Sequence, residues 1–316
     1  MQTRPLGATG LNIAPLVLGG NVFGWTADEA MSFSLLDAFV DAGLNAIDTA
    51  DIYSKWAPGH QGGESETIIG YWLARRPANR ERIVLITKVG SEFDAERKGL
   101  SRRWIERAVE DSLRRLHTDH LDVYLTHWPD DDTPIEETLG ALQTLVERGL
   151  VRAVGASNLD ANQLAAALQA SEAQHVARYA VLQPEYNLYN RDKFEGPLRD
   201  LTLRENIGVI SYYALASGYL TGKYRVPEDR AKSVRGARMD HYDNERGRGI
   251  LAALDEVAAG QRATLAEVAV AWVIAQPGIT APIASATNLE QLNSLVKATR
   301  LELTPEELAL LDAASR

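Results

Sequence analysis

Short apolar runs that alternate with helix-forming segments are the feature that most limits how this chain can fold. Eight such runs occur, at residues 15–20, 45–48, 83–88, 122–127, 151–157, 179–183, 208–212 and 279–283. Continuous apolar runs of this length are typical of parallel strands that are buried on both faces. Eight strand-then-helix units predict one (β/α)8 TIM barrel, an α/β fold, over a single domain of residues 1–316. A doubly wound sheet is the rival, but no G-x-G-x-x-G follows any run.

The remaining segments fit around such a barrel. A small N-terminal hairpin, from residues 3–5 and 11–13, is expected to close its bottom. The segment 216–248 is long, polar and glycine-containing, as binding loops and lids are. Thr26 and Asn288 are expected to cap helices. Helices are expected at residues 27–42, 65–75, 101–116, 135–147, 161–169, 263–276 and 304–313.

Composition narrows the classes of function. The net charge of −10 argues against non-specific nucleic-acid binding, which needs clustered lysine and arginine. The chain has no cysteine, no 18-residue apolar run and no apolar leader after Met1. A cytoplasmic protein that binds neither nucleic acid nor membrane is therefore expected.

Ionisable residues stand at the ends of three consecutive strands. Asp48, Lys88 and His127 each close an apolar run, and Tyr53 follows Asp48 by five residues. Taken singly, each has a structural explanation, such as a capping carboxylate, a surface base, a core phenol or a buried imidazole. Because the carboxyl ends of barrel strands open on one face, the four are expected to meet there as catalytic residues.

Their adjacency predicts proton chemistry. A phenol has a pKa near ~10, and a neighbouring ammonium lowers it. Lys88, held charged by Asp48, would thus make Tyr53 a proton donor, and His127 could bond to the oxygen being protonated. Such a donor suits carbonyl reduction. Since no side chain delivers hydride, a nicotinamide cofactor is implied.

Two other chemistries find less support in the sequence. The acidic run at residues 127–132 resembles no zinc-ligand spacing, so no metal is expected. A serine hydrolase would need a G-x-S-x-G elbow, and none is present.

Several motifs in chain order resemble the aldo-keto reductase family. They are Asn45-Ala-Ile-Asp-Thr-Ala-Asp-Ile-Tyr53, Gly62-Gly-Glu-Ser-Glu66, Ile86-Thr-Lys88, Thr126-His-Trp128, Val154-Gly-Ala-Ser-Asn158, Gln183-Pro-Glu-Tyr-Asn187 and Gly218-Tyr-Leu-Thr-Gly-Lys-Tyr224. The last two are similar to those of a bacterial subgroup close to the voltage-gated potassium-channel β subunits. The resemblance implies a barrel enzyme that reduces aldehydes or ketones with NADPH. It also implies that Tyr53 is the acid, Lys88 and Asp48 its tuning pair, and His127 the orienting group.

The resemblance also implies the cofactor contacts. Tyr212 would stack on the nicotinamide, and the segment 285–291, at the start of the last barrel helix, would bind the adenosine phosphate. The full set is Gly20, Asn21, Asp48, Ser157, Asn158, Gln183, Tyr212, Leu215, Gly218, Leu220, Gly222, Lys223, Ser285, Thr287 and Gln291. Two departures stand out: Tyr213-Ala214 replaces the family's frequent Ser-Pro, and the basic residues of many relatives are missing near Thr287. NADPH is therefore expected to be preferred only weakly, with NADH usable.

Aromatic residues on the loops outline a pocket. Phe23, Trp25, Trp56 and Trp128 would form its walls, although packing among the loops explains them equally well. With no long C-terminal tail, an open site is expected. The predicted partner is a small carbonyl compound, with neither its identity nor an oligomeric state selected. Two other functions stay open: a nicotinamide-binding regulatory or scaffold subunit, and an NAD-dependent aldose dehydrogenase that runs the oxidation.

Overall fold

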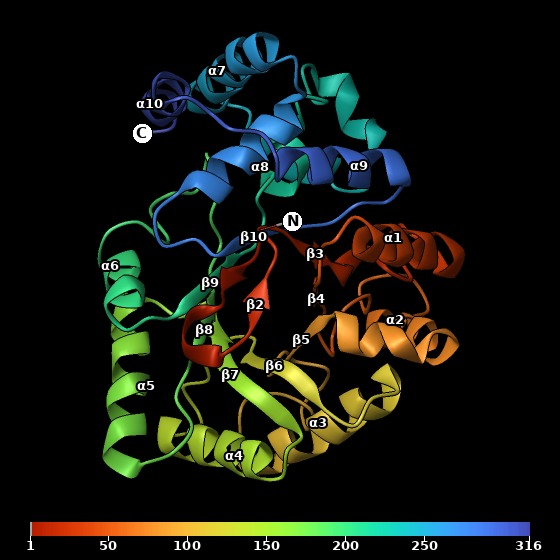
Figure 1. The fold of residues 1–316 in the computed structure, drawn as a ribbon, viewed down its shortest axis with the longest axis vertical. Helices are drawn as coiled ribbons and strands as arrows, with labels where there is room; N and C mark the ends of the chain where they lie inside the picture. Colours follow the sequence, from red (N-terminus) through yellow and green to blue (C-terminus); the bar gives the residue numbers. More distant parts are fainter. Residues whose placement is uncertain (1) are drawn as a thin grey trace.

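Eight parallel strands close into a barrel in the computed structural model, which describes residues 2–316. Strands that follow one another in the chain are neighbours, and β10 closes the barrel by pairing with both β9 and β3. The predicted TIM barrel is confirmed (Figure 1). The strands are β3 (Val17–Gly19), β4 (Ala46–Asp48), β5 (Val84–Val89), β6 (Leu121–Thr126), β7 (Val151–Ser157), β8 (Val181–Gln183), β9 (Gly208–Ser211) and β10 (Ala281–Ala284).

Helices surround the barrel, as Figure 1 shows. They are α1 (Glu29–Asp41), α2 (Glu64–Arg75), α3 (Arg102–Leu116), α4 (Ile135–Glu147), α5 (Ala161–Gln174), α6 (Pro197–Arg204), α7 (Glu245–Gln261), α8 (Leu265–Ala275), α9 (Leu289–Ala298) and α10 (Pro305–Ala314). Asn288 caps α9 as predicted. The predicted cap of α1 was wrong: Asp28, not Thr26, accepts the amide hydrogen of Met31. The helices α6 and α7 were not predicted.

The N-terminal hairpin fills one end of the barrel. Its strands β1 (Arg4–Pro5) and β2 (Asn12–Ile13) pair antiparallel. Leu6, Leu11 and Ile13 are buried in the same apolar cluster as the inward-facing strand residues. At Gly7, which has a φ of +54°, a Cβ atom would lie 2.2 Å from the amide nitrogen of Gly208. This confirms that the hairpin closes the bottom, so the site must lie at the opposite end.

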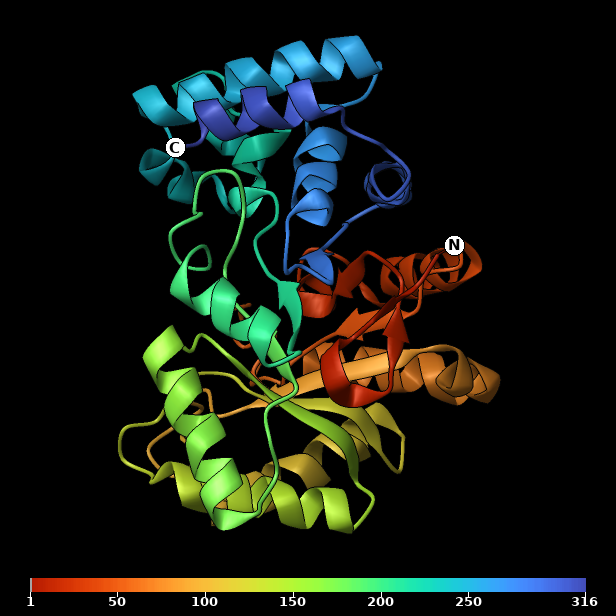
Figure 2. The same ribbon diagram turned by 60° about the vertical axis from the view of Figure 1, so that its left-hand side comes forward.

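The C-terminal helices pack together to one side of the barrel. Helices α7 and α10 lie side by side at the top of Figure 2, with α8 beneath them. In the part of the chain that the structure describes, no single helix is long and apolar enough to cross a membrane. The pair α7 and α8 passes that test only by combined length and composition, and it is bent by 96°.

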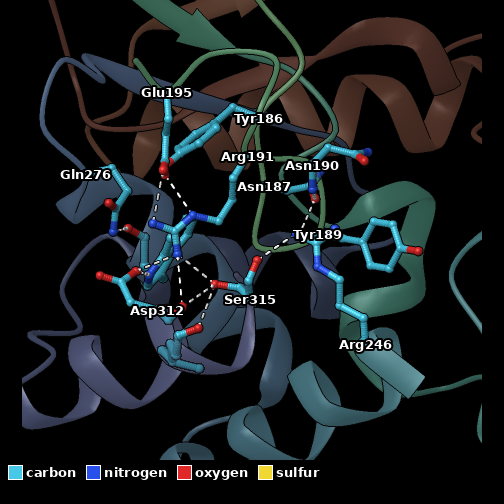
Figure 3. A network of polar contacts seen from close by, with 12 residues as sticks. Tyr186, Asn187, Tyr189, Asn190, Arg191, Glu195, Arg246, Gln276, Asp312 and Ser315 are labelled. Atoms are coloured by element: carbon cyan, nitrogen blue, oxygen red, sulfur yellow. Dashed lines mark hydrogen bonds and ion pairs between the residues drawn. The ribbon is translucent and has the colours of Figure 1, made fainter. Parts of the chain in front are cut away.

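A charged network ties the loop after β8 to the C-terminal helix. Arg191 pairs with Glu195 at 2.8 Å and with Asp312 of α10 at 2.9 Å, and it also donates to the hydroxyl of Ser315 at 2.7 Å (Figure 3). Tyr186 donates to the same Glu195 carboxylate at 2.6 Å. Because this loop continues from Gln183 and Glu185 at the end of β8, the network holds one side of the open end of the barrel in place.

Candidate active site

Lys88 is the centre of the polar cluster at the open end of the barrel. Its ammonium, fully buried in β5, donates to Asp48 Oδ2 at 2.8 Å, to the carbonyl of Thr49 at 2.8 Å and to the hydroxyl oxygen of Tyr53 at 2.9 Å. All three N–H groups of the ammonium are therefore used. The register of β4 and β5, in which Asp48 pairs with Ile86, brings Asp48 and Lys88 together.

Asp48 and Tyr53 complete this cluster. The second carboxylate oxygen of Asp48 accepts a hydrogen bond from Gln183 Nε2 at 2.8 Å, across the barrel from β8. Tyr53 also contacts Asp48 Oδ2, at 3.5 Å. Because Lys88 occupies a lone pair of the Tyr53 oxygen, the phenolic proton has only this long contact within the cluster. It remains available to a group in the cavity.

His127 follows β6 directly and faces Tyr53. Its ring centroid lies 6.0 Å from that of Tyr53, and the indole of Trp128 stacks against it at an interplanar angle of 9°. Ser91 Oγ lies 2.9 Å from Nδ1, which leaves Nε2 as the ring nitrogen without a partner among the described residues. The structure thus brings the four predicted catalytic residues together. It also adds Ser91, a residue that no sequence motif indicated.

The pKa directions fix the resting protonation states. Burial and then the charge of Asp48 hold the pKa of Tyr53 well above its ordinary value. This is opposite to the lowering by Lys88 that we expected from the sequence, because the enclosed phenol faces a carboxylate as well as an ammonium. Burial, reinforced by Lys88, holds the pKa of His127 well below 6.5. The resting site therefore contains a neutral phenol and a neutral imidazole, both able to hydrogen-bond a carbonyl oxygen.

One large cavity of about 1520 Å³ opens at this face. Asp48, Tyr53 and His127 line it, while Lys88 lies behind them. Most of the predicted cofactor residues also line it: Asn21, Ser157, Asn158, Gln183, Tyr212, Leu215, Gly218, Lys223, Ser285, Thr287 and Gln291.

Three predicted cofactor residues do not reach the cavity. Leu220 is fully buried in the core. Gly20 faces inward, where a Cβ atom would lie 2.8 Å from the hydroxyl of Ser65. Gly222 turns toward Arg225 and Leu265. Loop glycines and leucines match a motif by type, but which way each faces depends on packing that the motif does not encode.

Hydrogen bonds hold the side chains of the wall beside the Lys88 cluster in place. Ser157 donates to the carbonyl of Gln183 at 2.8 Å. Asn158 donates to the carbonyl of His127 at 2.8 Å and accepts from the hydroxyl of Tyr212 at 2.7 Å. Tyr212 is thereby held by its hydroxyl with its ring on the cavity wall. A nicotinamide is a flat ring that carries a carboxamide. It would fit between the ring of Tyr212 and the amide groups of this wall.

The start of α9 fits a phosphate. The amide N–H and the hydroxyl of Thr287 both donate to Gln291 Oε1, at 2.9 and 3.1 Å. A phosphate oxygen that displaced this amide oxygen could accept the same two hydrogen bonds. Close approach is also required nearby, since a Cβ atom at Gly19 would lie 2.6 Å from the hydroxyl of Ser285. The residues present therefore fit a nicotinamide dinucleotide.

Two of the four aromatic residues predicted to form the pocket walls line the cavity, and two do not. Trp56 and Trp128 line the cavity and are 47% and 49% exposed. Phe23 does not contribute, because its side chain is fully buried in the core. Trp25 stands behind Trp56, edge-on at 5.7 Å, rather than on the cavity wall. The part of the cavity beside Tyr53 and His127 thus has two exposed indoles.

The polar segment 216–248 adds cavity residues that sequence reasoning missed. It forms three short 3-10 helices, η4 (Ala216–Thr221), η5 (Pro227–Lys232) and η6 (Gly236–His241), before α7 begins. Ser233, Val234 and Arg235, between η5 and η6, line the cavity. The sequence indicated a binding loop by the segment's length, polarity and glycines, but not which of its residues reach the cavity. Over residues 2–316, no three histidine, aspartate or glutamate side chains gather as metal ligands.

Comparison with known proteins identifies the family. The model of the Aldo/keto reductase family matches residues 15–316. The chain belongs to the aldo/keto reductase family.

Several members of this family match the chain along nearly its whole length. The chain is 35% identical to the uncharacterized oxidoreductase YrpG of Bacillus subtilis, over 99% of this chain and 95% of that protein. The chain is 32% identical to a protein of Arabidopsis thaliana named "Probable voltage-gated potassium channel subunit beta", over 94% of this chain and 91% of that protein. The chain is 31% identical to the aldo-keto reductase AFTS1 of Alternaria alternata, over 99% of this chain and 91% of that protein. Similarity to channel β subunits, expected from the motifs, is confirmed, and the family supports an oxidoreductase that uses a nicotinamide cofactor.

Proposed function

We propose that this protein reduces aldehydes and ketones to alcohols with NADPH, with Tyr53 as the proton donor. The observation that carries the proposal is the Lys88 ammonium, which donates to both Asp48 and Tyr53 while Tyr53 and His127 face one cavity. A purely structural cluster has no need for a neutral phenol beside a neutral imidazole at a cavity wall.

The side chains divide the work around the carbonyl oxygen. His127, neutral and anchored through Ser91, orients that oxygen with its second ring nitrogen. Tyr53 gives its proton to the oxygen as negative charge develops there. Lys88 then lies 2.9 Å from the phenolate oxygen and stabilises its charge. When bound, the cofactor supplies the hydride that reaches the carbonyl carbon.

NADPH is the proposed cofactor, held by residues of three segments. Ser157, Asn158, Gln183 and Tyr212 would hold the nicotinamide, and residues 285–291 the adenosine phosphate. Thr287 and the amides of α9 offer that phosphate hydrogen bonds but no positive charge. NADH should therefore also be used, with NADPH preferred by a modest factor.

Turnover tests this function directly. When purified protein is mixed with NADPH and 4-nitrobenzaldehyde, the absorbance of NADPH should fall as the cofactor is oxidised. Tyr53→Phe should lower this rate by about 10²–10⁴-fold, the usual contribution of a general acid. NADPH should still bind to the variant, as followed by fluorescence quenching. A wild-type rate in Tyr53→Phe would remove Tyr53 from its role. Tyr71→Phe, an exposed tyrosine on α2, is the matched control.

A second function has one observation in its favour. Similarity to proteins named as potassium channel β subunits supports a nicotinamide-binding regulatory subunit with little turnover. Tight NADPH binding without reduction of any aldehyde in a substrate panel would favour this function over the first. An aldose dehydrogenase would instead show faster alcohol oxidation with NAD.

A further inference from the structure

A short chain of hydrogen bonds runs behind the Lys88 cluster. The hydroxyl of Ser65 donates to the carbonyl oxygen of Gly20 at 2.8 Å, and the hydroxyl of Thr49 lies 2.8 Å from Ser65 Oγ. The carbonyl oxygen of Thr49 in turn accepts from the Lys88 ammonium at 2.8 Å. Ser65 and Thr49 are both fully buried, and neither lines the cavity. The chain joins three separate segments: the one after β3, the one after β4 and the first turn of α2.

The direction of each hydrogen bond in this chain is fixed. A serine hydroxyl has one hydrogen, and a carbonyl oxygen can only accept, so the hydrogen of Ser65 is used at Gly20. Between Thr49 and Ser65, the donor must then be the hydroxyl of Thr49. An alanine in place of Ser65 would leave the Thr49 hydroxyl buried without this acceptor and would release the Gly20 carbonyl from α2.

The Thr49 end of the chain acts on Lys88. The ammonium gives its three hydrogens to Asp48, Thr49 and Tyr53. Because these hydrogens are held at fixed angles, the position of the Thr49 carbonyl helps to set the direction of the other two. The side chain of the same threonine is held by Ser65. Ser65 therefore influences how the ammonium points at Tyr53, although it contacts neither of them.

The Gly20 end of the chain acts on the wall of the cavity. Gly19 and Asn21, on either side of Gly20, both line the cavity. Asn21 accepts a hydrogen bond from Ser285, one of the residues proposed to hold the adenosine phosphate. A Cβ atom at Gly20 would lie 2.8 Å from Ser65 Oγ, so this backbone approaches α2 as closely as only a glycine allows. The position of this wall thus depends on the hydroxyl of Ser65.

We propose that Ser65 is a positioning residue that links the Lys88 ammonium to the cofactor side of the cavity. Its hydroxyl holds the Thr49 carbonyl on one side and the Gly20 segment on the other. The inference rests on the proposed function for the reacting end, whereas the Gly20 end is a matter of cofactor binding. Removal of the hydroxyl should therefore change two properties together, the rate of reduction and the affinity for NADPH.

Steady-state kinetics test the link to Lys88. In Ser65→Ala, kcat for 4-nitrobenzaldehyde with saturating NADPH should fall by about 5–50-fold with little change in the aldehyde KM, since a 1 Å displacement can cost roughly 10²-fold. Thr49→Val, which removes the other hydroxyl, should give a similar loss, and Ser65→Cys, with a weak thiol donor, a smaller one. The double variant Thr49→Val, Ser65→Ala should lose no more than the worse single variant. A multiplied loss would mean that the two hydroxyls act separately, and it would overturn the link.

The pH profile separates positioning from a general loss of folded protein. In the reverse reaction, alcohol oxidation with NADP+, Tyr53 accepts the proton as a phenolate, so the rate rises with pH through the pKa of Tyr53. A displaced ammonium stabilises the phenolate less, so Ser65→Ala should shift this rise to higher pH. An unshifted profile would overturn the link to Lys88. The other titratable groups around Tyr53 are unchanged in the variant: Asp48, His127, Tyr212 and Tyr213.

A binding test examines the Gly20 end and needs no turnover. Fluorescence quenching should give a dissociation constant for NADPH about 3–10-fold higher in Ser65→Ala than in wild type, the usual worth of one neutral hydrogen bond. Thr49→Val should keep the wild-type constant, because Ser65 can still donate to Gly20. An unchanged constant in Ser65→Ala would overturn the link. If wild type reduced no aldehyde, the proposed function would fail, and this comparison alone would decide the link.

Ser32→Ala is the matched control. Ser32 is also fully buried near the start of a helix, α1, and its hydroxyl donates to the carbonyl of Asp28 at 2.7 Å. Its loss should change neither kcat nor the dissociation constant of NADPH. Changes as large as those in Ser65→Ala would reduce the effect of Ser65 to general destabilisation and overturn its positioning role.

Discussion

Replacing Asp51 with asparagine should stabilise the protein, and increasingly so as the pH rises. Asp51 lies between the predicted catalytic residues Asp48 and Tyr53, is 1% exposed, and receives no side-chain hydrogen bond at either carboxyl oxygen from the described residues. Burial, and then the charge of Glu66, hold its pKa well above the ordinary value. Arg115, the amide of Ile52 and Lys88 oppose this shift but do not reverse it.

The sign of the effect follows from proton linkage. Above the unfolded pKa of about 3.9, folded Asp51 keeps a proton that the unfolded chain has released. The native state then binds more protons, so this residue makes the free energy of unfolding fall by about 1.4 kcal/mol per pH unit until the folded carboxyl also ionises. Asparagine is neutral in both states and removes this dependence. The gap between Asp51→Asn and wild type should therefore open above pH ~4 and widen at about that slope.

Urea denaturation between pH ~4 and pH ~8 measures this gap. Asp131→Asn, which removes an exposed carboxylate from the loop before α4, controls for the change in net charge. Parallel stability curves for wild type and Asp51→Asn, with a constant gap, would show that buried Asp51 is ionised and would refute the reasoning. Activity should change little in Asp51→Asn, since Asp51 does not line the cavity.

Three other variants test the site and its supports. Lys88→Met combined with Tyr53→Phe should reduce aldehyde turnover no more than the worse single variant, because the two act as a unit; a multiplied loss in steady-state kinetics would contradict this. Arg191→Met should lower the free energy of unfolding by roughly 1.5–3 kcal/mol in urea, whereas Arg178→Met, whose pair with a glutamate is more exposed, should cost less than ~1 kcal/mol. Thr287→Arg should raise the NADPH/NADH preference about tenfold, as measured by dissociation constants; an unchanged ratio would place the 2'-phosphate elsewhere.

The barrel was predictable because its strands carry an unambiguous signal. Strands buried on both faces must be largely apolar, and some end on a polar group at the open face, as β4 does at Asp48. Helix starts were less certain. Thr26 and Asp28 are both good capping residues, and the backbone decides between them: the amide of Ala27 bonds to the carbonyl of Val22, so the chain is still turning at Thr26. That bond depends on tertiary packing and leaves no mark on the sequence.

The missed helices have physical reasons too. Helix α6 is a short element whose proline, Pro197, lies in its first turn, a pattern that also suits a turn. Helix α7 begins with charged residues, so its first turn merged with the polar segment before it. The sequence also could not predict that Arg235 lines the cavity. The side-chain directions of an irregular segment depend on what it packs against, and Arg235 packs on Trp25, which lies about 210 residues earlier in the chain.

The pKa of Tyr53 is where sequence reasoning gave the wrong direction, and the correction changes the role of Lys88. Adjacency alone suggested that the ammonium makes the resting phenol acidic. In the folded chain the phenol is enclosed and also faces Asp48, so it stays neutral. The ammonium donates to the phenol oxygen, not to its proton, and its own charge is balanced by Asp48 at 2.8 Å. In the proposed reaction, Lys88 therefore has little to do until Tyr53 has given up its proton. It then lies beside a phenolate, already in place and already desolvated, and stabilises the state that proton transfer creates more than the state before it.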